Sequence, residues 1–114
     1  MKRYRVDVHE DGGVRTVVMA GEFDLDTLGS LQAALDAGEN AGAERVVVDV
    51  TRVTFADSSV LNLLLGAHRA LPLVLAGPLP DRLAHVLEVT CTDRVFTVAG
   101  TLAEARTVPL PPRP

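Results

Sequence analysis

Aromatic residues and cysteine are scarce in this chain of 114 residues, which has three Phe, one Tyr, no Trp and one Cys. The single cysteine, Cys91, excludes a disulfide bond within the chain, and no Cys or His stands near it at the spacing of a metal site. Hydrophobic residues still make up 47% of the chain. We therefore expect one compact domain with a core of Leu, Val and Ala, and no metal or other cofactor.

Clusters of positive charge and long hydrophobic runs are missing as well. The formal net charge is −4, and no basic patch typical of nucleic-acid binding is present. The longest apolar runs are far below the ~18 residues that a membrane-spanning helix needs. No N-terminal apolar stretch resembles a signal peptide. We expect a soluble cytoplasmic protein that binds neither nucleic acid nor membrane.

The first third of the sequence predicts a β-hairpin followed by a helix. Apolar residues alternate with polar ones over residues 4–9, a turn-forming Glu-Asp-Gly-Gly follows, and residues 14–20 again favour a strand. Asp24 then stands at the position of a helix cap, before leucines spaced by three and four residues. Gly38 and Gly42 indicate that this helix ends near residue 41.

The rest of the chain alternates between strand and helix patterns. Residues 45–50 are β-branched and apolar at nearly every position, which is typical of a strand covered on both faces. The further expected elements are a helix over 58–70, a strand over 73–76, a helix over 79–87, a strand over 95–98 and a short helix after Thr101.

This order, β-β-α-β-α-β-α-β-α, predicts an α/β fold in a single domain. We expect a mixed sheet of about five strands, with an initial hairpin and then alternating α and β elements, and with the helices mainly on one face. We assign this domain to residues 1–108. Residues 109–114 read P-L-P-P-R-P, which forms neither a helix nor a sheet interior, and we expect them to be a flexible tail.

Three polar residues, Asp57, Ser58 and Ser59, separate the strand over 45–50 from the apolar helix over 58–70. One interpretation is purely structural, because Asp and Ser oxygens cap the free backbone N–H groups at helix starts. The other is functional, since loops at the carboxyl ends of strands in α/β sheets meet ligands and partners. A helix N-terminus also tolerates negative charge, so a phosphate on a first-turn serine would not unfold the helix.

These residues resemble a known family. Residues 46–66 read V-V-V-D-V-T-R-V-T-F-A-D-S-S-V-L-N-L-L-L-G and are similar to the central segment of bacterial anti-sigma-factor antagonists, which are STAS domains. The family pattern is a buried strand, an aromatic residue and then D-S-S-G-L at the start of an apolar helix. Upstream, G-E-F-D at residues 21–24 is similar to the family's G-E-L-D turn. The resemblance covers about residues 4–106.

The resemblance implies a protein-binding function rather than catalysis. It implies that an anti-sigma factor with serine kinase activity binds the unphosphorylated protein and switches it off by phosphorylating Ser58, with Ser59 as a weaker candidate. The implied partner-binding residues are Asp24, Asp57, Ser58, Ser59 and Val60. A phosphatase is a candidate for a second partner. Val60 stands where the family has glycine, and the segment after the helix is shorter than usual.

Two alternatives remain open at the level of sequence. The first is a STAS scaffold without phosphorylation, or an accessory subunit of a transport system. The second is a small enzyme with Ser58 as nucleophile, which requires a histidine such as His68 or His85 within about 3 Å of its hydroxyl. His68 lies ten residues further along the same expected helix, about 15 Å away at 1.5 Å per residue.

Overall fold

The computed structural model describes residues 3–40 and 42–111. Its strands are β1 (Tyr4–Asp11), β2 (Val14–Phe23), β3 (Arg45–Ala56), β4 (Leu73–Ala76) and β5 (Thr97–Ala99). Its helices are a short 3₁₀ helix, η1 (Leu25–Thr27), and α1 (Gly29–Asn40), α2 (Ser58–Ala70), α3 (Asp81–Val89) and α4 (Leu102–Thr107). The predicted order of elements is confirmed, with η1 as an addition.

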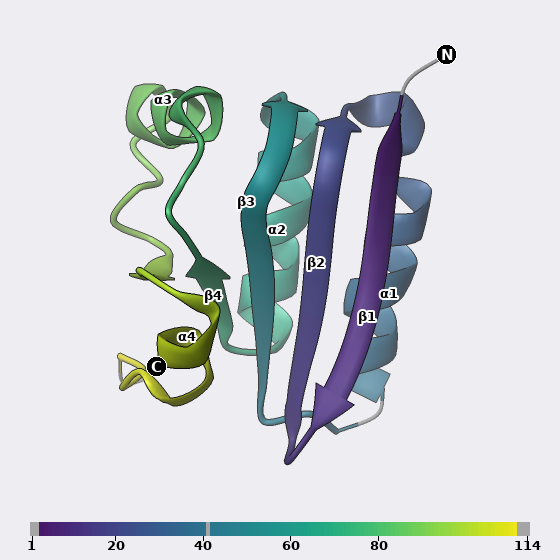
Figure 1. The fold of residues 1–114 in the computed structure, drawn as a ribbon, viewed down its shortest axis with the longest axis vertical. Helices are drawn as coiled ribbons and strands as arrows, with labels where there is room; N and C mark the ends of the chain where they lie inside the picture. The colour runs from purple at the N-terminus through teal and green to yellow at the C-terminus, as the bar shows by residue number, and fades with distance from the viewer. Residues whose placement is uncertain (1–2, 41, 112–114) are drawn as a thin grey trace.

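The five strands form one mixed sheet in the order β1-β2-β3-β4-β5 (Figure 1). β1 and β2 are antiparallel and form the predicted hairpin, whereas β3, β4 and β5 each lie parallel to the preceding strand. The carboxyl ends of β2, β3 and β4 therefore lie toward the same edge of the sheet. The loops and helix starts that follow these three strands are gathered there.

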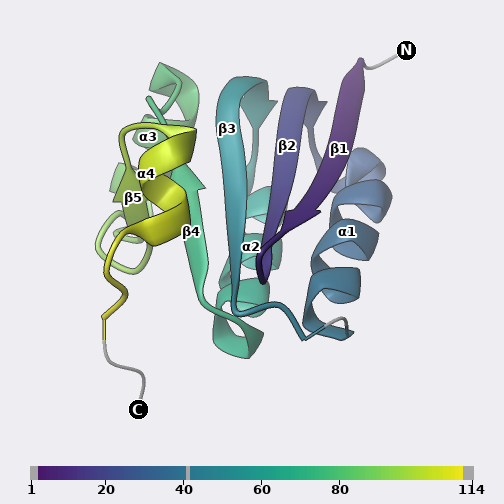
Figure 2. The same cartoon turned by 60° about the horizontal axis from the view of Figure 1, so that its bottom comes forward.

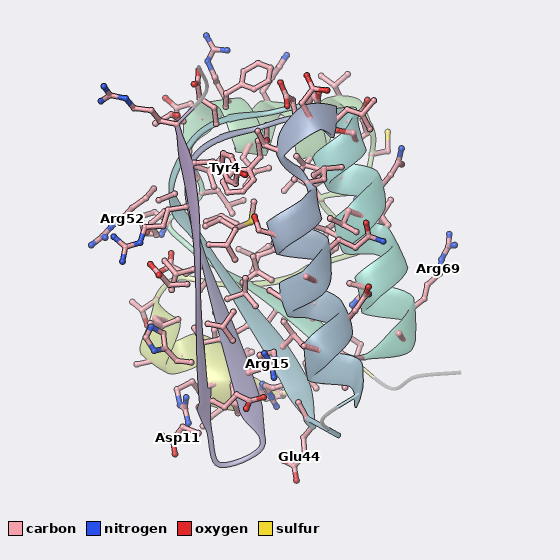
Figure 3. The ribbon with its side chains drawn as sticks, turned by 90° about the vertical axis from the view of Figure 1, so that its right-hand side faces the viewer. Tyr4, Asp11, Arg15, Glu44, Arg52 and Arg69 are labelled. Atoms are coloured by element: carbon pink, nitrogen blue, oxygen red, sulfur yellow. The ribbon has the colours of Figure 1, made fainter. Side chains whose placement is uncertain are left out.

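The helices lie mainly on one face, as the sequence predicts. Buried side chains from α1, α2 and α3 pack with the sheet in the larger hydrophobic cluster, whereas α4 contributes Ala105 to a second cluster on the opposite face. Figure 2 shows α4 in front of the sheet and α1 and α2 behind it. In Figure 3, Arg52 points to the side of the sheet away from α1 and α2.

The apolar run in β3 is explained by burial on both faces of the sheet. Val46 and Val48 belong to the larger cluster, Val47 belongs to the second cluster, and all three are buried. Because successive side chains of a strand point to opposite faces, each face receives alternate valines.

Several boundaries differ from the predictions, and three of the differences matter most. The strand predicted for 45–50 continues to Ala56, because it pairs with β2 as far as the couple Phe23 and Ala56. The last strand is Thr97–Ala99, which is displaced from the predicted 95–98. Leu25 is 74% exposed in η1 rather than part of the apolar stripe, since Asp24 caps this 3₁₀ turn and not α1 itself.

One residue of the predicted tail, Leu110, contacts the folded domain. Leu110 is half-buried and packs against the second hydrophobic cluster. Nearby, Arg45 Nη1 donates hydrogen bonds to the carbonyl oxygens of Ala105 and Val108 at 3.1 and 2.9 Å. These contacts attach the end of α4 and the start of the Pro-rich segment to the sheet. Residues 112–114 of the predicted tail lie outside the described residues.

Candidate functional site

The carboxyl edge of the sheet brings Asp24 and Asp57 together. The last paired residues of β2 and β3 are Phe23 and Ala56, and the two strands are parallel. Asp24 and Asp57 are the residues that follow this couple, and each is the N-cap of the helical element that comes next. Since neighbouring strands lie about 4.8 Å apart, the two carboxylates start from adjacent positions of one edge.

Asp57 caps α2 as the structural interpretation predicts. Its backbone is extended, with φ −112° and ψ −174°, and its Oδ1 accepts a hydrogen bond from the backbone N–H of Ser59 at 3.0 Å. The hydroxyl of Ser59 donates a second hydrogen bond to the same oxygen. Asp57 and Ser59 are both half-buried. The hydroxyl of Ser59 is therefore engaged in holding the start of the helix.

Ser58 differs from Ser59 in exposure and in hydrogen bonding. It is the first residue of α2 and is exposed to solvent. Its hydroxyl makes no hydrogen bond with any residue in the ranges 3–40 and 42–111. The positive end of the helix dipole lies at this position, and no acidic residue follows in the first turn. The cap thus uses Asp57 and Ser59 and leaves the Ser58 hydroxyl accessible.

Asp24 is held in place by a capping box. Its side chain accepts a hydrogen bond from the backbone N–H of Asp26 at 3.0 Å, and its own backbone N–H donates to Thr27 Oγ1 at 2.9 Å. Asp24 is half-buried, whereas Asp26 and Glu22 are exposed. Carboxylates therefore gather at the end of β2, and the capping box fixes the position of Asp24.

Val60 was predicted to bind the partner, but in the structure it is a core residue. Its side chain is only 1% exposed and belongs to the larger hydrophobic cluster. Val60, Leu61 and Leu64 form the buried stripe of α2 at helical spacing. Because the side chain points into the protein, it is not available to a partner, and it does not cover the surface around Ser58.

His68 takes a structural role at the opposite end of α2. Its Nδ1 accepts a hydrogen bond from the backbone N–H of Leu73 at 3.3 Å, and its ring lies 5.7 Å from that of Phe96. Figure 3 shows Arg69, the next residue, at the lower end of the helix. His85 is exposed on α3, and Cys91 is exposed just beyond that helix. Within the described ranges, no group of three or more His, Cys, Asp or Glu side chains is arranged to hold a metal ion.

A groove on the α3 side of β3 was not predicted. It has a volume of about 410 Å³ and is lined by Phe55, Ala56, Asp81, Arg82, His85 and Val86. The Arg82 guanidinium carbon lies 5.8 Å from the centre of the Phe55 ring. Phe55 is recognisable in the sequence as the motif aromatic, but its pairing with Arg82 depends on where α3 packs, which local patterns do not reveal.

Comparison with known proteins identifies the family. A family model described as "Mlab, STAS domain" matches residues 6–100. The chain therefore belongs to the STAS domain family. None of the curated protein sequences matches it.

Solved structures share this fold over nearly the whole chain. An anti-sigma factor antagonist from Mycobacterium paratuberculosis is 25% identical, with a TM-score of 0.78 over 91% of this chain and 92% of that one. SpoIIAA, an anti-sigma factor antagonist in its unphosphorylated form, is 21% identical, with a TM-score of 0.75 over 90% and 93%. The phosphorylated form of SpoIIAA, a Bacillus cell fate determinant, is 21% identical, with a TM-score of 0.69 over 90% and 96%. This chain is thus a STAS domain that resembles anti-sigma-factor antagonists.

In the described part of the chain, the helices are too short or too polar to cross a membrane.

Proposed function

We infer that this STAS domain is an anti-sigma-factor antagonist that is controlled by phosphorylation of Ser58. In the unphosphorylated state it binds an anti-sigma factor with serine kinase activity, and the phosphate releases it. The observation that carries this proposal is the contrast between the two serines. Ser58 is exposed and makes no hydrogen bond within the described ranges, whereas Ser59 is bonded to the cap residue Asp57. A kinase would reach Ser58 without opening the helix cap.

The charge at this edge explains why a phosphate would end binding. A phosphoserine carries about −1.5 to −2 charges near neutral pH. It would lie beside Asp57 and close to Asp24, so the surface that the partner meets would become strongly anionic. A partner surface shaped for a hydroxyl would have to accept this charge or remove its hydration. A loss of about 3–4 kcal/mol would weaken binding by roughly several hundredfold, since 1.4 kcal/mol corresponds to a factor of ten.

The fold itself would tolerate the phosphate. Ser58 occupies the first position of α2, where the helix dipole stabilises an anion by about 0.3–1 kcal/mol. Ser58 is not one of the side chains that cap the helix. The modification would therefore change the surface and leave the domain folded, which is the behaviour that a reversible switch requires.

We propose binding, and not catalysis, as the activity of this edge. A serine nucleophile needs a general base within about 3 Å. His68 lies ten residues from Ser58 on the same helix, about 15 Å at 1.5 Å per residue, and its Nδ1 is bonded to the Leu73 N–H. A protein with this role would work in the cytoplasm, together with its kinase.

Incubation with ATP and each candidate anti-sigma kinase of the same genome tests the proposal. Intact-mass measurement and site mapping should find one phosphate, on Ser58. Ser58→Ala should remove it, and the matched variant Ser59→Ala should retain it. Binding should be strong before ATP is added and weak afterwards. An unchanged mass with kinases that are active on their own substrates would refute the phosphorylation switch.

The alternative is a STAS scaffold, or an accessory subunit of a transport system, that binds its partner without phosphorylation. The feature that favours it is the departure of the sequence from the antagonist motif, because Val60 replaces the motif glycine at the third position of α2, although its side chain faces the core. For this alternative we expect partner capture from cell extract to be unaffected by Ser58→Asp. For the switch we expect that variant to lose the partner.

A further inference from the structure

The groove between β3 and α3 results from the unequal lengths of the strands. β4 pairs with β3 only as far as Ala76 and Asp49, so residues 50–56 of β3 extend beyond it. α3 follows β4 and lies beside this extension (Figure 1). Leu83 and Leu87 of α3 are buried in the core. The outward-facing side of the helix and the end of β3 leave the groove of about 410 Å³ between them.

The groove includes residues that closely precede Ser58 in the chain. Phe55 and Ala56 line it, and they are the last two residues of β3 before the cap residue Asp57 and then Ser58. A partner that covers the Ser58 hydroxyl from the α3 side would therefore also contact this groove.

The lining combines an exposed aromatic ring with a cation. Phe55 is 36% exposed, and the Arg82 guanidinium lies over its ring. Arg82 is exposed and forms no ion pair with any of the residues that the structure describes. Aromatic side chains and Arg are enriched at the centres of protein interfaces, where an aromatic body excludes water and the guanidinium binds a carboxylate.

Charged side chains border both the groove and the start of α2. Asp24 follows β2 and Asp57 follows β3, whereas Asp81 and Arg82 of α3 line the groove. Asp81 lies in the first turn of α3, where the helix N-terminus stabilises its negative charge. Arg82 is therefore the cation of the groove that is placed over the aromatic ring, and complementary charge at such a group helps to orient a docking partner.

We propose that this groove is the second half of the partner-binding surface, and that it takes a partner segment with a large apolar side chain next to a carboxylate. The apolar side chain lies against Phe55, Ala56 and Val86, and the carboxylate pairs with Arg82. The proposal rests on the proposed function for the identity of the partner, but the chemistry of the groove is testable without that partner.

The first experiment titrates the full-length, ¹⁵N-labelled protein with two blocked dipeptides, acetyl-Leu-Glu-amide and acetyl-Leu-Lys-amide. The expected result is weak, saturable shifts of the amides of Phe55, Ala56, Arg82 and Val86, with several-fold tighter binding of the glutamate peptide. Arg82→Gln should remove this preference and keep the leucine-dependent shifts. Equal affinities in the unchanged protein, shifts elsewhere, or no shifts would overturn the proposal.

The second experiment uses the kinase partner identified as described for the proposed function. Phe55→Ala and Arg82→Glu should each weaken its binding by at least about tenfold, at 1.4 kcal/mol per factor of ten. The matched charge control is Arg69→Glu, at the far end of α2, which should bind as the unchanged protein does. Circular dichroism confirms that each variant is folded. Equal binding of all three variants would overturn the proposal that the partner occupies the groove, and it would leave the proposed Ser58 switch intact. If no kinase binds the unchanged protein, the proposed function fails. The dipeptide titration alone then tests whether the groove binds an apolar side chain next to a carboxylate.

Discussion

Asp57 and Ser59 are joined by two hydrogen bonds to one oxygen, because Oδ1 of Asp57 accepts from both the backbone N–H and the hydroxyl of Ser59. This pair closes the first turn of α2 and separates the roles of the two neighbouring serines. Ser59 stabilises the helix start, and Ser58 presents its hydroxyl to solvent.

Loss of the cap should lower stability more than loss of the proposed phosphorylation site. We expect Asp57→Ala to reduce the free energy of unfolding by about 1–2 kcal/mol, which is typical for removal of an N-cap side chain. Ser58→Ala should change it by less than about 0.5 kcal/mol, since that side chain is exposed and makes no hydrogen bond within the described ranges. Urea denaturation of the two variants measures the difference. Equal losses would mean that Ser58 also holds the helix.

A fixed negative charge at Ser58 should abolish binding and spare the fold. We expect Ser58→Asp to weaken binding of the kinase partner by roughly several hundredfold, since it places a carboxylate beside Asp57 in the proposed interface. Its melting temperature should stay within a few degrees of that of the unchanged protein, because an anion at a helix N-terminus is stabilising. Isothermal titration calorimetry and thermal melts check the two parts. Tight binding by folded Ser58→Asp would contradict the switch.

Restoration of the family glycine at position 60 should destabilise this domain. Val60 is 1% exposed in the core, so Val60→Gly would leave a cavity and place glycine in a helix. We expect a loss of about 2–4 kcal/mol by urea denaturation. The matched control is Asn62→Gly, an exposed position in the same helix, which should cost less than about 1 kcal/mol. Similar losses in both variants would show that Val60 contributes little to packing.

The glycine of G-E-F-D should be required for the fold. Gly21 has a φ of +95°, and a Cβ at this position would lie 2.2 Å from the carbonyl oxygen of Arg3. That oxygen already accepts a hydrogen bond from the Glu22 N–H at 2.8 Å, so it is not free to move away. We expect Gly21→Ala to cost about 2–4 kcal/mol, from left-handed backbone strain and overpacking together.

Gly12→Ala is the control for that variant. Gly12 also has a positive φ, +59°, but a Cβ there would meet no atom within 4 Å. Its cost should be about 1 kcal/mol, from backbone strain alone. Denaturation midpoints of Gly21→Ala and Gly12→Ala measure the stability that each variant loses. Equal losses would show that the contact of the new Cβ with the Arg3 carbonyl oxygen adds nothing to the backbone strain.

The order of elements was predictable because it depends on local patterns. The β-branched run in β3 and the apolar stripe in α2 report which faces are buried, whereas the alternation in β1 predicts the strand although Tyr4 and Val8 are exposed. The bounds of α2 were predicted correctly because Asp57 and Pro72 limit the helix on both sides. The extension of β3 to Ala56 was missed, since residues 51–55 are mostly exposed and their pairing with β2 leaves no apolar pattern.

The sequence by itself determined the family, the sheet-and-helix order and the position of the D-S-S motif, because these depend on residue types at short spacing. Only the tertiary structure decided that the Ser59 hydroxyl is bonded in the helix cap, that Val60 faces the core, and that Arg82 lies over Phe55. These facts depend on the rotation of α2 about its axis and on the packing of α3 beside β3. Contacts between elements distant in sequence set both, and no local pattern encodes them.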